Sequence, residues 1–93
     1  MLALTHASNV TGAISPLDLI LPRAQKVGAF VVLDTCQSAA HLPLDFRALK
    51  AAGVDAMVLS SHKMLGPTGI GALVATEELL AAMPPVLTGG SMI

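Results

Sequence analysis

The chain has 93 residues, of which 54% are hydrophobic and 12% are charged, and its formal net charge is −1. A globular domain usually carries about 25% charged residues, so this composition is typical of the inside of a larger domain. Only 2% of the residues are aromatic. Without stacking rings or a cationic cluster, the sequence does not fit a protein that binds nucleic acid.

The sequence also gives no sign of a membrane segment or a metal site. No apolar run approaches the ~20 residues of a transmembrane helix, and residues 1–9 lack the basic start of a signal peptide. The single cysteine, Cys36, excludes an internal disulfide and a cysteine-based zinc cluster. We therefore expect no membrane contact and no metal ligands, and take a cytoplasmic location as the default.

The chain begins with an expected strand and an expected helix. Residues 2–5 are a short apolar run followed by a polar loop. Ser15 is predicted to be the N-cap of a helix that starts at Pro16, and apolar residues at helical spacing continue it until Gly28. Pro22 lies inside this helix and is expected to kink it or shorten its start.

The middle of the chain repeats this alternation. Residues 29–33 are a continuous β-rich apolar run, typical of a strand covered on both faces, and the run ends in Asp34. A second helix is predicted over residues 45–52, with Asp45 as its N-cap and Gly53 as its C-terminal stop.

The last part of the chain contains two strands in close succession. Residues 56–59 are predicted to form a buried strand that ends in Ser60, and residues 70–75 another strand after a turn at residues 66–69. A final helix is expected over residues 76–83, because acidic residues favour a helix N-terminus and two prolines follow.

The order of these elements predicts an α/β fold with a mostly parallel sheet and helices packed on it. The turn at residues 66–69 is too short to hold a crossover helix. The last strand is therefore expected to run antiparallel to the one before it.

Polar side chains follow each expected strand. The carboxyl ends of the strands in an open α/β sheet gather at one edge, where such proteins build their sites. The candidates that would meet there are Asn9, Asp34, Gln37, Ser60, His62 and Lys63. Taken singly, each has an ordinary explanation: a surface lysine, an aspartate that caps a turn, or a side chain that satisfies loop backbone groups. Only the set points to a site.

Two sequence motifs contain most of these candidate residues and indicate what kind of site they form. Residues 32–39 (VLDTCQSA) and residues 59–71 (LSSHKMLGPTGIG) resemble the class V aminotransferases, enzymes of fold type I that use pyridoxal 5′-phosphate (PLP). Within that family the sequence is most similar to the SufS-type cysteine desulfurases, which include selenocysteine lyases and serve iron–sulfur cluster assembly. Residues 5–12 resemble the loop before the cofactor aspartate, and residues 83–85 and 89–93 are typical of the same branch.

The resemblance implies a role for each cofactor residue. Lys63 would hold PLP as a Schiff base and later carry a proton, for which a deprotonated amine is needed. Asp34 would face the pyridine nitrogen and keep it protonated. Gln37 would donate to the phenolate oxygen of the ring, and Ser60 and His62 would bind the phosphate.

The resemblance also implies a substrate residue and excludes a sulfur acceptor. Asn9 would lie near the substrate carboxylate. Cys36 lies inside the cofactor turn, where the family usually has a small residue, so we expect it to behave as a small buried side chain. The sulfur-accepting cysteine of the family is expected beyond Ile93. His6 and His41 have no motif support and are expected to be structural or exposed.

The resemblance finally implies that residues 1–93 are the central part of the PLP-binding large domain, cut at both ends and without the small domain. The parent would be a homodimer that converts L-cysteine to L-alanine and passes sulfur through an enzyme persulfide to an acceptor protein. The alternatives are a selenocysteine lyase acting on L-selenocysteine or another class V aminotransferase. An alternative of another class is a truncated product that only associates with other chains. A P-loop is set aside, because its glycines would precede Lys63.

Overall fold

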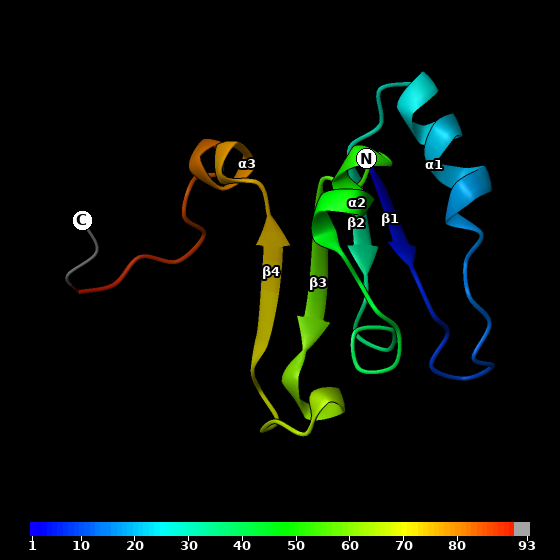
Figure 1. Cartoon of the computed structure of the whole chain (residues 1–93). Helices are drawn as coiled ribbons and strands as arrows, with labels where there is room; N and C mark the ends of the chain where they lie inside the picture. The colour runs from blue at the N-terminus through cyan, green and yellow to red at the C-terminus, as the bar shows by residue number, and fades with distance from the viewer. Residues whose placement is uncertain (91–93) are drawn as a thin grey trace.

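The computed structural model describes residues 1–90 and contains a four-stranded sheet flanked by short helices (Figure 1). The strands lie in chain order, β1 (Leu2–Thr5), β2 (Val31–Asp34), β3 (Ala56–Ser60) and β4 (Gly71–Ala75). The first three are parallel, and β4 is antiparallel to β3. The predicted α/β class, the element order and the antiparallel last strand are confirmed.

The register of the sheet places the three parallel strand ends side by side. Thr5 at the end of β1 lies opposite Asp34 at the end of β2. Asp34 in turn lies opposite Val58, and β3 continues past this pair to Ser60. The residues that follow the three strands therefore start from the same edge of the sheet.

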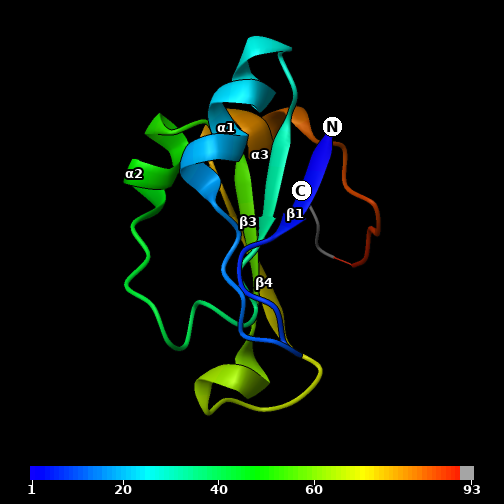
Figure 2. The same cartoon turned by 90° about the vertical axis from the view of Figure 1, so that its right-hand side faces the viewer.

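Two helices connect the parallel strands, α1 between β1 and β2 and α2 between β2 and β3, and a third helix, α3, follows β4. Helix α1 spans Leu17–Lys26, α2 spans Phe46–Ala51 and α3 spans Glu77–Ala82. Both α1 and α2 pack against one face of the sheet (Figure 2). The carboxylate of Asp45 accepts a 2.8 Å hydrogen bond from the Arg47 amide, as a helix N-cap should.

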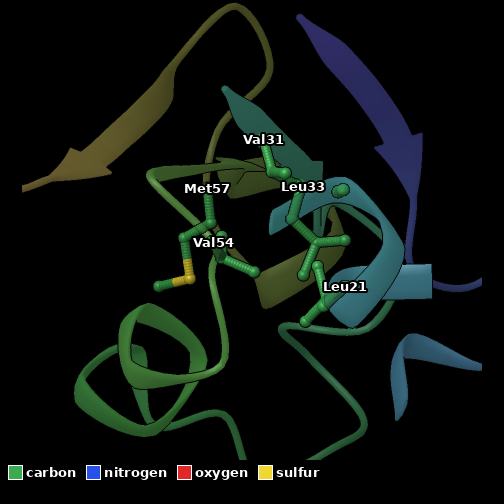
Figure 3. Packing of buried hydrophobic residues seen from close by; sticks show 6 residues of the cluster. Leu21, Val31, Leu33, Val54 and Met57 are labelled. Carbon is green, nitrogen blue, oxygen red and sulfur yellow. The ribbon is translucent and has the colours of Figure 1, made fainter. Parts of the chain in front are cut away.

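The core lies between that sheet face and the two helices (Figure 3). Val31 and Leu33 alternate onto the same face of β2, and both are completely buried. The residues packed with them come from α1, from the segment just before β3 and from β3: Leu21, Ala24, Val54 and Met57. This small core holds β2, the central strand that ends in Asp34.

Two details of the prediction were wrong, the cap of α1 and the start of β2. Ser15 does not cap α1; its hydroxyl donates instead to the Thr5 carbonyl at 2.6 Å, and Pro16 takes the cap position without a side-chain hydrogen bond. Helix α1 contains Pro22 in its interior, and a kink at Pro22 stays a prediction. Strand β2 begins at Val31, because the Ala29 amide still bonds the helix carbonyl of Ala24.

The remaining differences concern the ends of elements. The chain after β3 forms a 3₁₀ turn, η1 (Ser61–Met64), which the sequence did not predict. Of residues 89–93, which resemble the same branch of the family, residues 91–93 lie outside the described residues. Within residues 1–90, none of the helices has the length and apolar character needed to cross a bilayer.

Candidate functional site

A cavity of about 310 Å³ opens at the carboxyl edge of the parallel strands. All three parallel strands contribute to it, β1 and β2 through their ends and the loops that follow, β3 through η1. Its lining residues are Thr5, Ala7, Ser8, Asn9, Asp34, Cys36, Gln37 and Lys63. Four of the six predicted site residues thus lie around one cavity, although 54 positions separate the first from the last.

The turn after β3 brings Lys63 to this cavity. Leu65, next to η1, has a φ of 64°, and the chain reverses there. The Gly66 amide donates to the Ser61 carbonyl at 2.9 Å, and a Cβ on Gly66 would meet the Ser61 side chain at 2.9 Å. A glycine is therefore required where the turn closes on itself.

Lys63 points across the edge of the sheet toward the loop that follows β1. Its Nζ donates a hydrogen bond of 3.0 Å to Oδ1 of Asn9. The lysine is half-buried and Asn9 is exposed. The contact places the predicted lysine beside the residue that was predicted to bind substrate.

Asp34 is held by the turn that follows β2. Its Oδ1 accepts a 2.9 Å hydrogen bond from the Cys36 amide, which fixes the orientation of the carboxylate. Its other oxygen makes no hydrogen bond within the described part of the chain. The half-buried Gln37 lies on the same turn and lines the same cavity.

The turn is anchored to β3 by Thr35. Its amide and its hydroxyl both donate to the Val58 carbonyl, at 2.9 and 2.7 Å. Beside it, burial raises the pKa of the Cys36 thiol, and Asp34 raises it further. The Ser60 hydroxyl and the Lys63 charge lower the same pKa, without reversing the net rise. At neutral pH the thiol is therefore protonated and a poor nucleophile.

Ser60 and His62 do not line the cavity. The Oγ atom of Ser60 is buried and has no hydrogen-bond partner among residues 1–90. His62 is exposed on η1. A buried hydroxyl without a partner is unusual and is consistent with an acceptor that the protein chain does not supply.

Sequence reasoning missed one functional-site neighbour, His6. It is only 8% exposed and contacts Ser38, which is 1% exposed, through its Nδ1 and the serine Oγ at 2.9 Å. Burial lowers the pKa of His6. The only signal in the sequence was its position between the strand end and Asn9.

The comparisons with known proteins agree with this geometry. The family model described as aminotransferase class-V matches residues 1–93. The chain belongs to the class-V aminotransferase family. Members of this family and of the cysteine desulfurases within it depend on PLP.

Individual relatives are cysteine desulfurases. A protein of Mycobacterium leprae named probable cysteine desulfurase 2 is 56% identical over all 93 residues, which cover 22% of that relative. The crystal structure of the cysteine desulfurase CsdA (S-sulfonic acid) from Escherichia coli is 43% identical with a TM-score of 0.86, covering 97% of this chain and 22% of CsdA. A structure of SspA in complex with cysteine is 30% identical with a TM-score of 0.79, covering 95% and 24%. The chain thus spans about a fifth of the length of the class-V proteins it matches.

The residues around the cavity fit the cofactor of the family. PLP presents an aldehyde, a basic ring nitrogen, a phenolate oxygen and a phosphate. The cavity offers an amine on Lys63, a carboxylate oxygen free on Asp34 and an amide on Gln37. The unpartnered hydroxyl of Ser60 lies at the end of the neighbouring strand.

Proposed function

We propose that this chain is the lysine-bearing central part of the large domain of a PLP-dependent cysteine desulfurase. The observation that carries the proposal is the meeting of Lys63, Asn9, Asp34 and Gln37 around one cavity at the sheet edge. The similarity to cysteine desulfurases at up to 56% identity supports the choice of reaction.

Lys63 is proposed to hold the cofactor covalently and to move a proton at its Nζ. The hydrogen bond from Nζ to Oδ1 of Asn9 holds the amine beside the cavity. PLP, when bound, supplies an electron sink for the substrate amino acid. Asn9 is proposed to orient the substrate carboxylate once Lys63 no longer donates its hydrogen bond to Asn9.

Asp34 and Gln37 are proposed to bind the ring, and Ser60 and His62 the phosphate. Because one Asp34 oxygen is occupied by the Cys36 amide, the free oxygen is the one available to the ring nitrogen. A carboxylate so oriented keeps that nitrogen protonated. The Ser60 hydroxyl would gain in the phosphate the partner that it lacks.

The substrate of the whole protein is proposed to be L-cysteine, with sulfur passing first to an enzyme cysteine and then to an acceptor protein, in a homodimer. Cys36 is not suited to accept the sulfur, since its raised pKa keeps the thiol protonated. The accepting cysteine is therefore proposed to lie outside residues 1–93. A selenocysteine lyase is the second candidate.

The proposal is tested with the purified protein that carries this chain. After incubation with PLP and reduction with borohydride, we expect a pyridoxyl group on Lys63 by peptide mass spectrometry. We also expect L-alanine to form from L-cysteine. Lys63→Ala should abolish both, whereas the control Lys26→Ala, on α1, should keep both.

Each contrary outcome has a meaning. Alanine formed from L-selenocysteine but not from L-cysteine favours the lyase. Absence of a pyridoxyl group on Lys63 in the wild-type protein refutes the proposal and leaves the truncated, non-catalytic product.

A further inference from the structure

His6 connects two segments of the site that are far apart in the sequence. Its imidazole Nδ1 contacts Ser38 Oγ at 2.9 Å. Its amide donates to the Asp34 carbonyl at 2.9 Å, and its carbonyl accepts from the Ser15 amide at 2.8 Å. The neighbours Thr5 and Ala7 both line the cavity. The residue therefore lies at the point where the two segments meet.

The first of these segments is the loop of residues 6–15, which presents Asn9. The loop is tight: the Ser8 amide donates to the Ala13 carbonyl, and the Gly12 amide donates back to the Ser8 carbonyl, at 2.9 and 3.0 Å. Ser15 closes its base on Thr5 and His6. These hydrogen bonds connect Asn9 to the base of the loop, so the position of that base at His6 bears on the position of Asn9.

The second segment, residues 34–38, presents Asp34 and Gln37. It ends in the buried Ser38, whose hydroxyl contacts His6 Nδ1 at 2.9 Å and donates to the Thr35 carbonyl at 3.4 Å. Buried polar side chains cost free energy unless they are hydrogen-bonded, and Ser38 is the side-chain partner of the His6 imidazole. Two aliphatic side chains in place of His6 and Ser38 would need no hydrogen bond between them. They would therefore not fix the distance between the two segments.

We propose that His6 is a positioning residue, whose buried contact with Ser38 sets the distance between Asn9 on one segment and Asp34 and Gln37 on the other. The inference rests on the proposed function for its effect on binding, but its geometric content does not require the cofactor. Without the contact, the backbone hydrogen bond from His6 to Asp34 would still hold the base of the loop, and the rest of residues 6–15 would be free to move away from residues 34–38. Asn9 would then leave hydrogen-bonding distance of Lys63.

The test compares His6→Leu, Ser38→Ala and the double variant in the whole protein. We expect each single variant to raise the PLP dissociation constant and the KM for L-cysteine about tenfold, the effect of losing one buried hydrogen bond. The effect on kcat should be smaller, because Lys63 and Asp34 remain. The double variant should resemble either single one, because the two side chains act through one contact.

Two further variants separate positioning from simple loss of stability. Val54→Ala removes core volume just before the start of β3, away from the cavity, and should lower the melting temperature without changing either binding constant. His6→Asn places an amide nitrogen near the former Nδ1 and should restore part of the affinity.

A cofactor-free measurement makes the inference independent of the proposed function. Amide hydrogen exchange should rise in residues 6–15 and 34–38 of His6→Leu, and elsewhere only as much as in Val54→Ala. Unchanged exchange in those two segments, or binding constants that follow the melting temperature in all variants, overturns the inference. If His6→Leu does not fold, Ser38→Ala gives the same comparison.

Discussion

Replacing Asp34 by Asn tests whether the two carboxylate oxygens of Asp34 have separate hydrogen-bond partners, the Cys36 amide for one and the ring nitrogen of PLP for the other. In the structure Oδ1 accepts from the Cys36 amide at 2.9 Å, and the second oxygen is free. Asn keeps an acceptor for the Cys36 amide, so the turn and the stability should be unchanged. Its second position becomes an NH₂ group, which is a donor and cannot accept from a protonated ring nitrogen.

The expected loss of activity follows from the strength of the hydrogen bond that Asp34→Asn removes. A hydrogen bond to a charged group contributes about 1.5–3 kcal/mol, and about 1.4 kcal/mol is a factor of ten in rate. We therefore expect Asp34→Asn to lower kcat about 10- to 100-fold, measured as alanine formed from L-cysteine under saturating PLP.

The matched control is Asp55→Asn. The carboxylate of Asp55 also accepts from a backbone amide, that of Val31 at 2.7 Å, but at the opposite edge of the sheet. This variant should keep full activity. A wild-type rate in Asp34→Asn, or an equal loss in both variants, would refute the assignment of Asp34 to the ring nitrogen.

Three further predictions concern stability and reactivity. Because burial lowers the pKa of His6, its contribution to stability is complete above the unfolded value of about 6.5 and declines as pH falls below it; urea midpoints at pH 8 and pH 5 should differ less in His6→Asn. Cys36 should react with iodoacetamide more slowly than an unstructured cysteine at pH 8, since its pKa is raised; equal rates contradict this. Asp45→Ala should lower the free energy of unfolding by about 1 kcal/mol in denaturant titrations, because α2 loses its cap.

The sheet and the edge at which the site lies were predictable because local patterns determine them. Continuous apolar runs define β2 and β3, and the short turn before β4 leaves room only for an antiparallel return. The polar residues after each strand then meet through the general geometry of parallel sheets. The roles assigned to those residues stay predictions.

The details that failed depend on partners distant in sequence or on unusual backbone geometry. Ser15 was expected to cap α1, but the fold brings the Thr5 carbonyl to its hydroxyl. Leu65 adopts a positive φ that a sequence would place on glycine. The contact of His6 with Ser38 joins residues 32 positions apart, and nothing local in the chain indicates it.

The order of the strands has a consequence for how this part of the protein is made. Among the described residues, each strand after β1 pairs with the strand that precedes it in the chain. Each of these strands can therefore form hydrogen bonds with a strand that has already been synthesised. Loop closures between consecutive elements are short, and short closures favour rapid folding. On a ribosome, which releases the chain from its N-terminus, Asn9, Asp34 and Lys63 can come together in the order in which they are synthesised. The edge that would receive the cofactor can therefore form once residues 66–70, which bond to Ser61 at the start of η1, have emerged, before α3 exists.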